Sequence, residues 1–167
     1  MSAVLSSVAL VRVVASDPAM PPTIAREVTA AIDKLFLQFI REGRCTNAAV
    51  TTEADGRFLV IAWEGPPLSG CSHDKIAQVI AAYEARCGCA LLAAPPIAIG
   101  DPAAVHLTDR AGLRRMVASS ACDAQTPVWD LRAVTLGDWR SGPVVLGSSV
   151  WASLVQLPTA APTKGAA

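Results

Sequence analysis

The chain carries little charge and no excess of either sign. Charged residues make up 17% of its 167 residues, below the roughly 25% usual in soluble domains, and the 14 basic and 14 acidic side chains cancel. Proteins that bind nucleic acids concentrate positive charge to displace counterions from phosphates, so we expect no nucleic-acid partner. The 52% share of hydrophobic residues also excludes an intrinsically disordered chain, which combines low hydrophobicity with high net charge.

Long hydrophobic runs and export signals are also missing. The longest apolar candidate, residues 91–99, is shorter than the roughly 20 residues that span a bilayer and contains Pro95 and Pro96. Residues 1–16 have no basic side chain ahead of their apolar part, and Arg12 lies inside it, which is not the pattern of a signal peptide. The five cysteines, at positions 45, 71, 87, 89 and 122, are odd in number and lack the spacing of a disulfide scaffold. We therefore expect a cytoplasmic protein with free thiols and no membrane partner.

The motifs of two common enzyme classes are absent. A phosphate-binding P-loop needs Gly-Lys followed by Ser or Thr, and no Lys in this chain follows a Gly. The G-x-S-x-G turn that carries the nucleophile of many hydrolases does not occur either. Cys87-Gly88-Cys89 is a C-x-C pair without a second pair, whereas structural zinc sites use C-x₂₋₄-C spacing. The sequence therefore predicts no cofactor and no metal site.

The first half of the chain alternates strand-like and helix-like segments. Residues 8–15 are rich in β-branched side chains and predict a buried strand. Residues 23–42 have apolar side chains at helical spacing, with Thr23 as the expected N-cap and Gly43 as the end. Strand-like residues 48–53 and 58–63 flank Asp55-Gly56, a strong signal for a hairpin turn that requires positive φ.

A second helix and a fourth strand complete the predicted order. Residues 73–86 have one apolar face and end at Gly88, and residues 90–99 read as a strand that Pro95 and Pro96 force to an edge or a bulge. The order strand, helix, strand, strand, helix, strand is that of the split βαβ, or ferredoxin-like, α+β fold, an antiparallel sheet with two covering helices. A short strand at 104–107, a helix from Thr108 and a strand at 128–135 extend it. We expect a single domain over residues 1–157 and a flexible tail over 158–167.

The segment before the second helix is the candidate site. Gly70, Cys71, Ser72, His73 and Asp74 lie between a strand end and a helix start, with Ser72 or Cys71 as the N-cap. A thiol beside the unpaired N–H groups of a helix start has a lowered pKa; His73 would add positive charge, and Asp74 would oppose the thiolate. The alternative is structural: Gly70 forms a tight turn, Ser72 caps the helix and Cys71 fills a gap in the core.

The predicted topology places further residues beside this segment. In a split βαβ sheet, the loop after the first helix and the end of the fourth strand lie at the same edge as the loop before the second helix. Arg44 and Asp101 are therefore expected beside Cys71, where the guanidinium would favour the thiolate.

The order of these motifs resembles a group of small bacterial proteins of unknown function, many of them labelled as ABC-transporter ATPases. The resemblance extends from Val11 to Leu154. The matching pieces are Arg57-Phe58-Leu59, Gly70-Cys71-Ser72 with Asp74, Thr126-Pro127-Val128-Trp129, and Val150-Trp151. His73 stands where that group has an aliphatic residue, and Val150 where it has Ser. The resemblance implies a role for Cys71 and Asp74 but no activity, because the P-loop that an ATPase needs is missing.

Three functions are compatible with these features. The first is protein association, as a homo-oligomer or with a protein partner, to which a neutral, apolar chain with several Trp residues is suited. The second is a thiol-dependent enzyme or redox-responsive protein with Cys71 as the nucleophile. The third is binding of a small anionic ligand at the helix end formed by Gly70 to Ser72.

Overall fold

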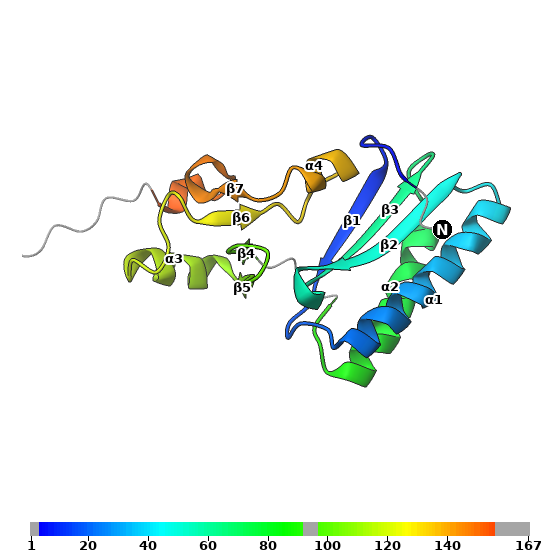
Figure 1. Cartoon of the computed structure of the whole chain (residues 1–167), viewed down its shortest axis with the longest axis horizontal. Helices are drawn as coiled ribbons and strands as arrows, with labels where there is room; N and C mark the ends of the chain where they lie inside the picture. Colours follow the sequence, from blue (N-terminus) through cyan, green and yellow to red (C-terminus); the bar gives the residue numbers. More distant parts are fainter. Residues whose placement is uncertain (1–3, 92–96, 156–167) are drawn as a thin grey trace, which may run out of the picture.

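A three-stranded antiparallel sheet with two helices on one face forms the first layer. The computed structural model describes residues 4–91 and 97–155. The sheet contains β1 (Leu10–Ala15), β2 (Asn47–Glu53) and β3 (Phe58–Glu64) in the order β1-β3-β2. Helices α1 (Pro22–Arg41) and α2 (Gly70–Cys87) cover one face, with α1 over β2 and beside α2 (Figure 1). The fold is α+β, as predicted.

The central strand β3 is buried on both faces. Leu59, Ile61 and Trp63 point toward the helices and belong to the same core cluster as Phe36 of α1. Phe58, Val60 and Ala62 point the other way and belong to a second cluster. Because side chains alternate between the faces of a strand, a continuous apolar run is what a strand with two buried faces requires.

The β2–β3 hairpin forms at the predicted turn. A 3₁₀ turn, η1 (Ala54–Gly56), joins the strands, and Ala54, Asp55 and Gly56 all have positive φ. Glycine is required at position 56, since a Cβ there would lie 2.5 Å from the carbonyl oxygen of Met20.

Both helices begin earlier than the sequence indicates. Helix α1 starts at Pro22 with Pro21 at the N-cap, so Thr23 is not the cap. Helix α2 starts at Gly70, three residues before the predicted start, with Ser69 as its N-cap. Its end agrees with the prediction, since Gly88 has the left-handed conformation (φ 68°) of a C-cap.

The predicted fourth strand does not join the first sheet. Strand β4 (Ile97–Ile99) belongs to a second antiparallel sheet in the order β5-β4-β6-β7, with β5 (His106–Thr108), β6 (Pro127–Trp129) and β7 (Val144–Val145). Among the described residues of the predicted strand, Ala90 alone pairs with the β1 side, through a bridge to Asp17. Proline has no N–H to donate, so Pro95-Pro96 opposes a continuous ladder through this segment. Both prolines, like the predicted tail at 158–167, lie outside the described residues.

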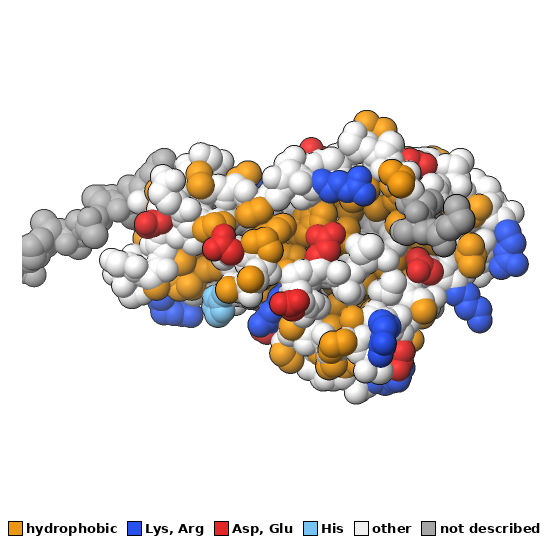
Figure 2. Space-filling model, viewed as in Figure 1, with side chains coloured by type: hydrophobic (Ala, Val, Ile, Leu, Met, Phe, Trp, Pro, Cys, Tyr) orange, Lys and Arg blue, Asp and Glu red, His pale blue; other side chains and the backbone are white. Residues whose placement is uncertain are grey.

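The second layer covers the face of the first sheet that the helices leave open. It also contains α3 (Arg110–Ala118), α4 (Leu136–Arg140), η2 (Leu146–Ser148) and η3 (Ala152–Leu154). Trp129 and Trp139 pack on Phe58 with ring centroids 5.2 and 5.1 Å away, and the Trp139 indole N–H donates to Glu53 (2.9 Å). Figure 2 shows hydrophobic side chains gathered near the centre of one face and charges of both signs scattered around them. Within the described residues, none of the helices has the length and apolar character needed to cross a membrane.

Candidate functional site

The start of α2 is capped by Ser69. Its hydroxyl accepts the Ser72 backbone N–H (3.3 Å) and lies 3.1 Å from the Ser72 hydroxyl. Cys71 and Ser72 are therefore inside the first turn, and the prediction that one of them is the N-cap is wrong. The earlier start determines which way each side chain points: Ser72 is fully buried, whereas Cys71 is exposed.

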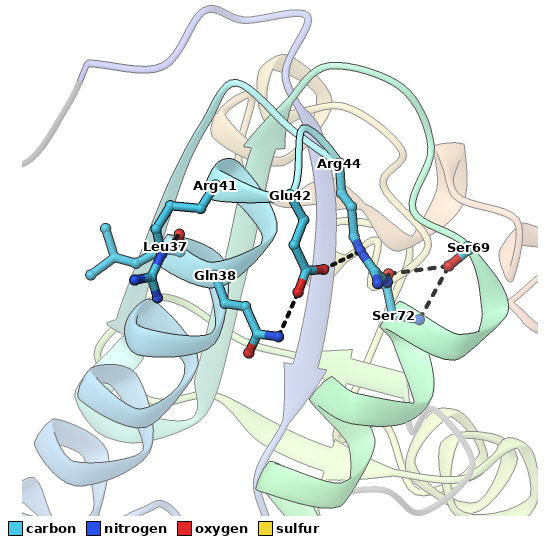
Figure 3. A network of polar contacts seen from close by, with 7 residues as sticks. All are labelled: Leu37, Gln38, Arg41, Glu42, Arg44, Ser69 and Ser72. Atoms are coloured by element: carbon cyan, nitrogen blue, oxygen red, sulfur yellow. Dashed lines mark hydrogen bonds and ion pairs between the residues drawn. The ribbon is translucent and has the colours of Figure 1, made fainter.

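Arg44 reaches this helix start from the loop after α1. Its Nη1 donates to the Ser72 hydroxyl (2.9 Å), and its Nε pairs with Glu42 (2.6 Å). Gln38 donates to the other oxygen of Glu42 (2.6 Å), so the contacts join the end of α1 to the start of α2 (Figure 3). The hydrogen bond from Gln38 and the positive charge of Arg44 hold the pKa of Glu42 below its usual value.

This network acts as a clamp between the two helices. We call Gln38, Glu42, Arg44, Ser69 and Ser72 the helix clamp. The Arg44 guanidinium also lies over the Phe39 ring, 5.4 Å from its centroid. The guanidinium thus has partners within the protein, Ser72 and Glu42. The geometry favours a structural role for Arg44.

The other predicted site residues separate into different surroundings. His73 packs against Trp63 with ring centroids 6.0 Å apart, and Asp74 is exposed on the next position of the helix. Asp101 follows β4 in the second layer, where the neighbouring Gly100 carbonyl accepts the Trp129 indole N–H (3.0 Å). Within residues 4–91 and 97–155, no hydrogen bond or ion pair joins Asp101 to the start of α2, and β4 belongs to the other sheet.

The cysteines differ in exposure. Cys45, Cys89 and Cys122 are buried, and burial raises the pKa of each of these thiols. Cys87 is half-buried, and Cys71 is exposed. The structure thus places Cys71 within reach of reagents in solution, and the Cys71 thiol has no hydrogen bond within the described part of the chain.

The outer edge of β2 is a feature that sequence reasoning missed. The Ser16 N–H donates to the Arg57 carbonyl (2.8 Å), which makes these two residues a hydrogen-bonded pair just beyond β1 and β3. In an antiparallel ladder such pairs alternate, so every second residue of β3 bonds to β1 and the residues between them bond to β2. The same alternation turns the backbone groups of Ala48, Val50 and Thr52 away from β3. The Ala48 N–H donates to the side-chain oxygen of Asn47 (3.0 Å). In the described residues, no other group bonds to these outward N–H and C=O groups.

One flank of α1 borders this edge. Arg26 lines a hollow of about 550 Å³ together with Thr52 and Glu53, which places this flank beside β2. Ala30, Asp33 and Leu37 follow Arg26 at helical spacing and are exposed, and Leu37 points away from α2 (Figure 3). We call the outward groups of Ala48, Val50 and Thr52 and this flank of α1 the β2-edge surface.

Comparison with known proteins adds no relative. No protein-family model, curated protein or solved structure matches this chain. The resemblance to the group of small bacterial proteins that share the Gly70-Cys71-Ser72 and Asp74 motif therefore stays a prediction.

The sequence indicates the helix clamp in part but does not indicate the free edge of β2. The clamp was visible in part, because a topology with two helices on one face places Arg44 next to the start of α2. The edge was not visible, since the hydrophobic pattern of residues 47–53 does not say whether a strand has one neighbour or two.

Proposed function

We propose that the protein is an association module that forms a homodimer through the β2-edge surface. The observation that carries this proposal is the free edge of β2, a seven-residue strand whose register with β3 is continuous. Natural proteins protect exposed edges with Lys, Pro, bulges or short strands, because unpaired N–H and C=O groups template pairing with another chain. Strand β2 contains no Lys, Pro or bulge.

The other sheet edges of the described residues are blunted. At β1 the Val11 N–H donates to the Val134 carbonyl (3.0 Å), and Asp17 exchanges two backbone hydrogen bonds with Ala90 (3.1 and 2.7 Å). In the second sheet the edge strands β5 and β7 have only 3 and 2 residues. This contrast supports β2 as the edge that pairs with another chain.

A second copy fits this surface in antiparallel orientation. A two-fold axis at Val50 pairs Val50 with itself and Ala48 with Thr52 of the second copy. The unpaired outward groups then gain partners, and the Ala48 N–H exchanges the Asn47 side chain for the Thr52 carbonyl of the second copy. Because α1 lies over β2, the two α1 helices then run antiparallel beside each other. Since α1 runs opposite to β2 and Arg26 is level with Thr52, the middle of α1 lies near the axis. This arrangement brings Arg26 of one copy toward Asp33 of the other, a complementary pair.

Leu37 supplies apolar area to the same contact. Its side chain is 60% exposed and lies one turn of α1 after Asp33. Partial burial already raises the pKa of Asp33 above its usual value. A cation from the second copy would offset that cost, so the charge pattern of the flank favours a like partner.

Sedimentation velocity over a range of protein concentrations tests the proposal. We expect a concentration-dependent dimer that Leu37→Glu abolishes, because the substitution places a charge in the contact. Val134→Glu is the matched control, since Val134 has a similar exposure (63%) but lies in the second layer. A protein that stays monomeric at all concentrations, or a dimer that only Val134→Glu disrupts, would contradict the proposal.

Disulfide trapping reads the register of the pairing. In a Cys71→Ser background, Ala49→Cys and Thr51→Cys proteins are mixed and oxidised. With the axis at Val50, Ala49 of one copy lies opposite Thr51 of the other in a non-hydrogen-bonded pair, where Cβ atoms are closest. We therefore expect the mixed disulfide to exceed both symmetric ones. A predominance of either symmetric disulfide would move the axis to another residue.

A further inference from the structure

Cys87 and Cys89 contact each other at the end of α2. Gly88 turns the chain back at the helix end, so that the Cys89 N–H donates to the Cys87 sulfur (3.4 Å). The Cys89 thiol also approaches the Cys87 carbonyl oxygen (3.8 Å). Both sulfurs therefore lie on the same side of this turn.

The segment that carries Cys89 is held at several points. Ala90 exchanges backbone hydrogen bonds with Asp17, and the Leu91 N–H donates to the Glu84 carboxylate. Leu91 is buried in the core between the helices and the sheet. With its flanking residues fixed in this way, Cys89 remains next to Cys87, and closing a bond between them requires little further ordering.

The two thiols differ in access. Cys87 is half-buried, whereas Cys89 is 3% exposed. Burial raises the pKa of Cys89, and the hydrogen bond with Cys87 adds to this effect. A small oxidant from solution therefore meets Cys87 first and leaves Cys89 as the neighbouring thiol that reacts second.

We propose that Cys87 and Cys89 form a redox-modification site for peroxide, with Cys87 as the thiol that is oxidised and Cys89 as the thiol that resolves it. The Cys87 sulfur attacks one oxygen of hydrogen peroxide, the O–O bond breaks, and the products are the Cys87 sulfenic acid and water. The Cys89 sulfur then attacks the Cys87 sulfur. The S–S bond forms, the S–O bond breaks, and the hydroxyl group leaves with the thiol proton as a second water. Two thiols are oxidised to one disulfide, and one peroxide is reduced to two waters.

The position of the pair suits a reversible modification. The stabilisation that a disulfide provides through chain entropy grows with the length of the loop it closes, and this loop contains a single intervening residue. The bond would therefore add little to the stability of the fold, unlike a structural disulfide. Labile disulfides of this kind are the ones that reductants reopen.

Peptide mapping of the native protein tests the proposal directly. Trypsin places Cys87 and Cys89 together in the peptide 87–110, while Cys71 lies in the peptide 58–75. The reduced native protein is exposed to hydrogen peroxide, then unfolded in denaturant so that every remaining thiol is accessible, blocked with iodoacetamide and digested. We expect the peptide 87–110 to lose two hydrogen atoms of mass and to take up no label, and to take up two labels after treatment with a thiol reductant. The proposal is overturned if this peptide still takes up two labels after Cys71 has been oxidised.

Two variants separate the roles of the thiols. In Cys89→Ser the resolving thiol is missing, so dimedone, which labels sulfenic acids, should modify Cys87. In Cys87→Ser the buried Cys89 should stay reduced. Cys122→Ser removes another buried thiol and should leave the Cys87–Cys89 disulfide unchanged. Dimedone labelling at Cys89 rather than at Cys87 would reverse the assignment, and the wild-type peptide map stands independently of how the variants fold.

Discussion

The hydrogen bond between Arg44 and Ser72 gives the sharpest test of the helix clamp. The clamp predicts that Arg44→Met and Ser72→Ala interact energetically, because each removes one partner of the same bond (2.9 Å). Arg44→Met keeps an unbranched apolar stem that can still pack on Phe39. Ser72→Ala leaves the ion pair between Arg44 and Glu42 in place. The double-mutant cycle therefore isolates the bond to Ser72 from the other contacts of the guanidinium.

The size of this coupling follows from burial. Ser72 is fully buried, and its hydroxyl has a second neighbour, the Ser69 hydroxyl at 3.1 Å. A hydrogen bond from a charged donor contributes about 1.5–3 kcal/mol when the alternative is an unsatisfied buried group. Because Ser69 remains available to Ser72 after Arg44 is removed, we expect a coupling at the low end of this range, about 1.5–2 kcal/mol.

Urea unfolding of the wild type, both single variants and the double variant measures the coupling. Equal m-values across the four proteins would show that the comparison concerns native-state stability. A coupling below about 0.3 kcal/mol, the usual scatter for independent sites, would refute the clamp as a stabilising contact between α1 and α2.

Three further predictions concern single positions. Gly56→Ala should destabilise the fold by more than about 2 kcal/mol, because the new Cβ would overlap the Met20 carbonyl oxygen. Gly43 has a similar positive φ but open space around it, so Gly43→Ala should cost only about 1 kcal/mol. Urea unfolding of both variants measures the difference. Cys71 should be the first of the five thiols that iodoacetamide modifies in the native protein, because it is exposed, and mass spectrometry that finds a buried thiol modified first would contradict this. The pKa of Asp33 is raised in the folded state, so the folded protein binds the proton more tightly and loses stability as the pH rises. Asp33→Asn should therefore stabilise the monomer at pH 7, and this gain in the free energy of unfolding should shrink as the pH falls toward 3.8. A gain that grows on acidification would contradict the prediction.

Local chemistry made the first layer predictable. The Asp55-Gly56 turn and the apolar runs on either side of it specify the hairpin, and Gly88 specifies the end of α2, because each depends on backbone conformations that few residues adopt. The start of α2 was less determined, since Ser69 and Ser72 are both good N-caps. A difference of three residues at this start exposes Cys71 and buries Ser72.

The second layer was beyond what periodicity can indicate. Residues 97–99 are apolar and strand-like in either sheet. The choice between the sheets depends on the hairpin partner His106 to Thr108 and on the more distant Pro127 to Trp129. The predicted proximity of Asp101 to Cys71 followed from the wrong choice. The proximity of Arg44 to Ser72 depended only on α1 and α2 and is present in the structure.

The second layer also limits where the protein can associate. A split βαβ sheet normally leaves one face free of helices, and dimers can form through that face or through an edge. Here Trp129 and Trp139 pack on the outward side of β3, so this face is already used within the chain. The helices occupy the other face, and the edge at β1 is bridged by Val134 and Ala90. Among the described residues, sheet pairing with a second chain is therefore left to the long edge of β2, and loss of the second layer should open a competing, face-to-face mode of association.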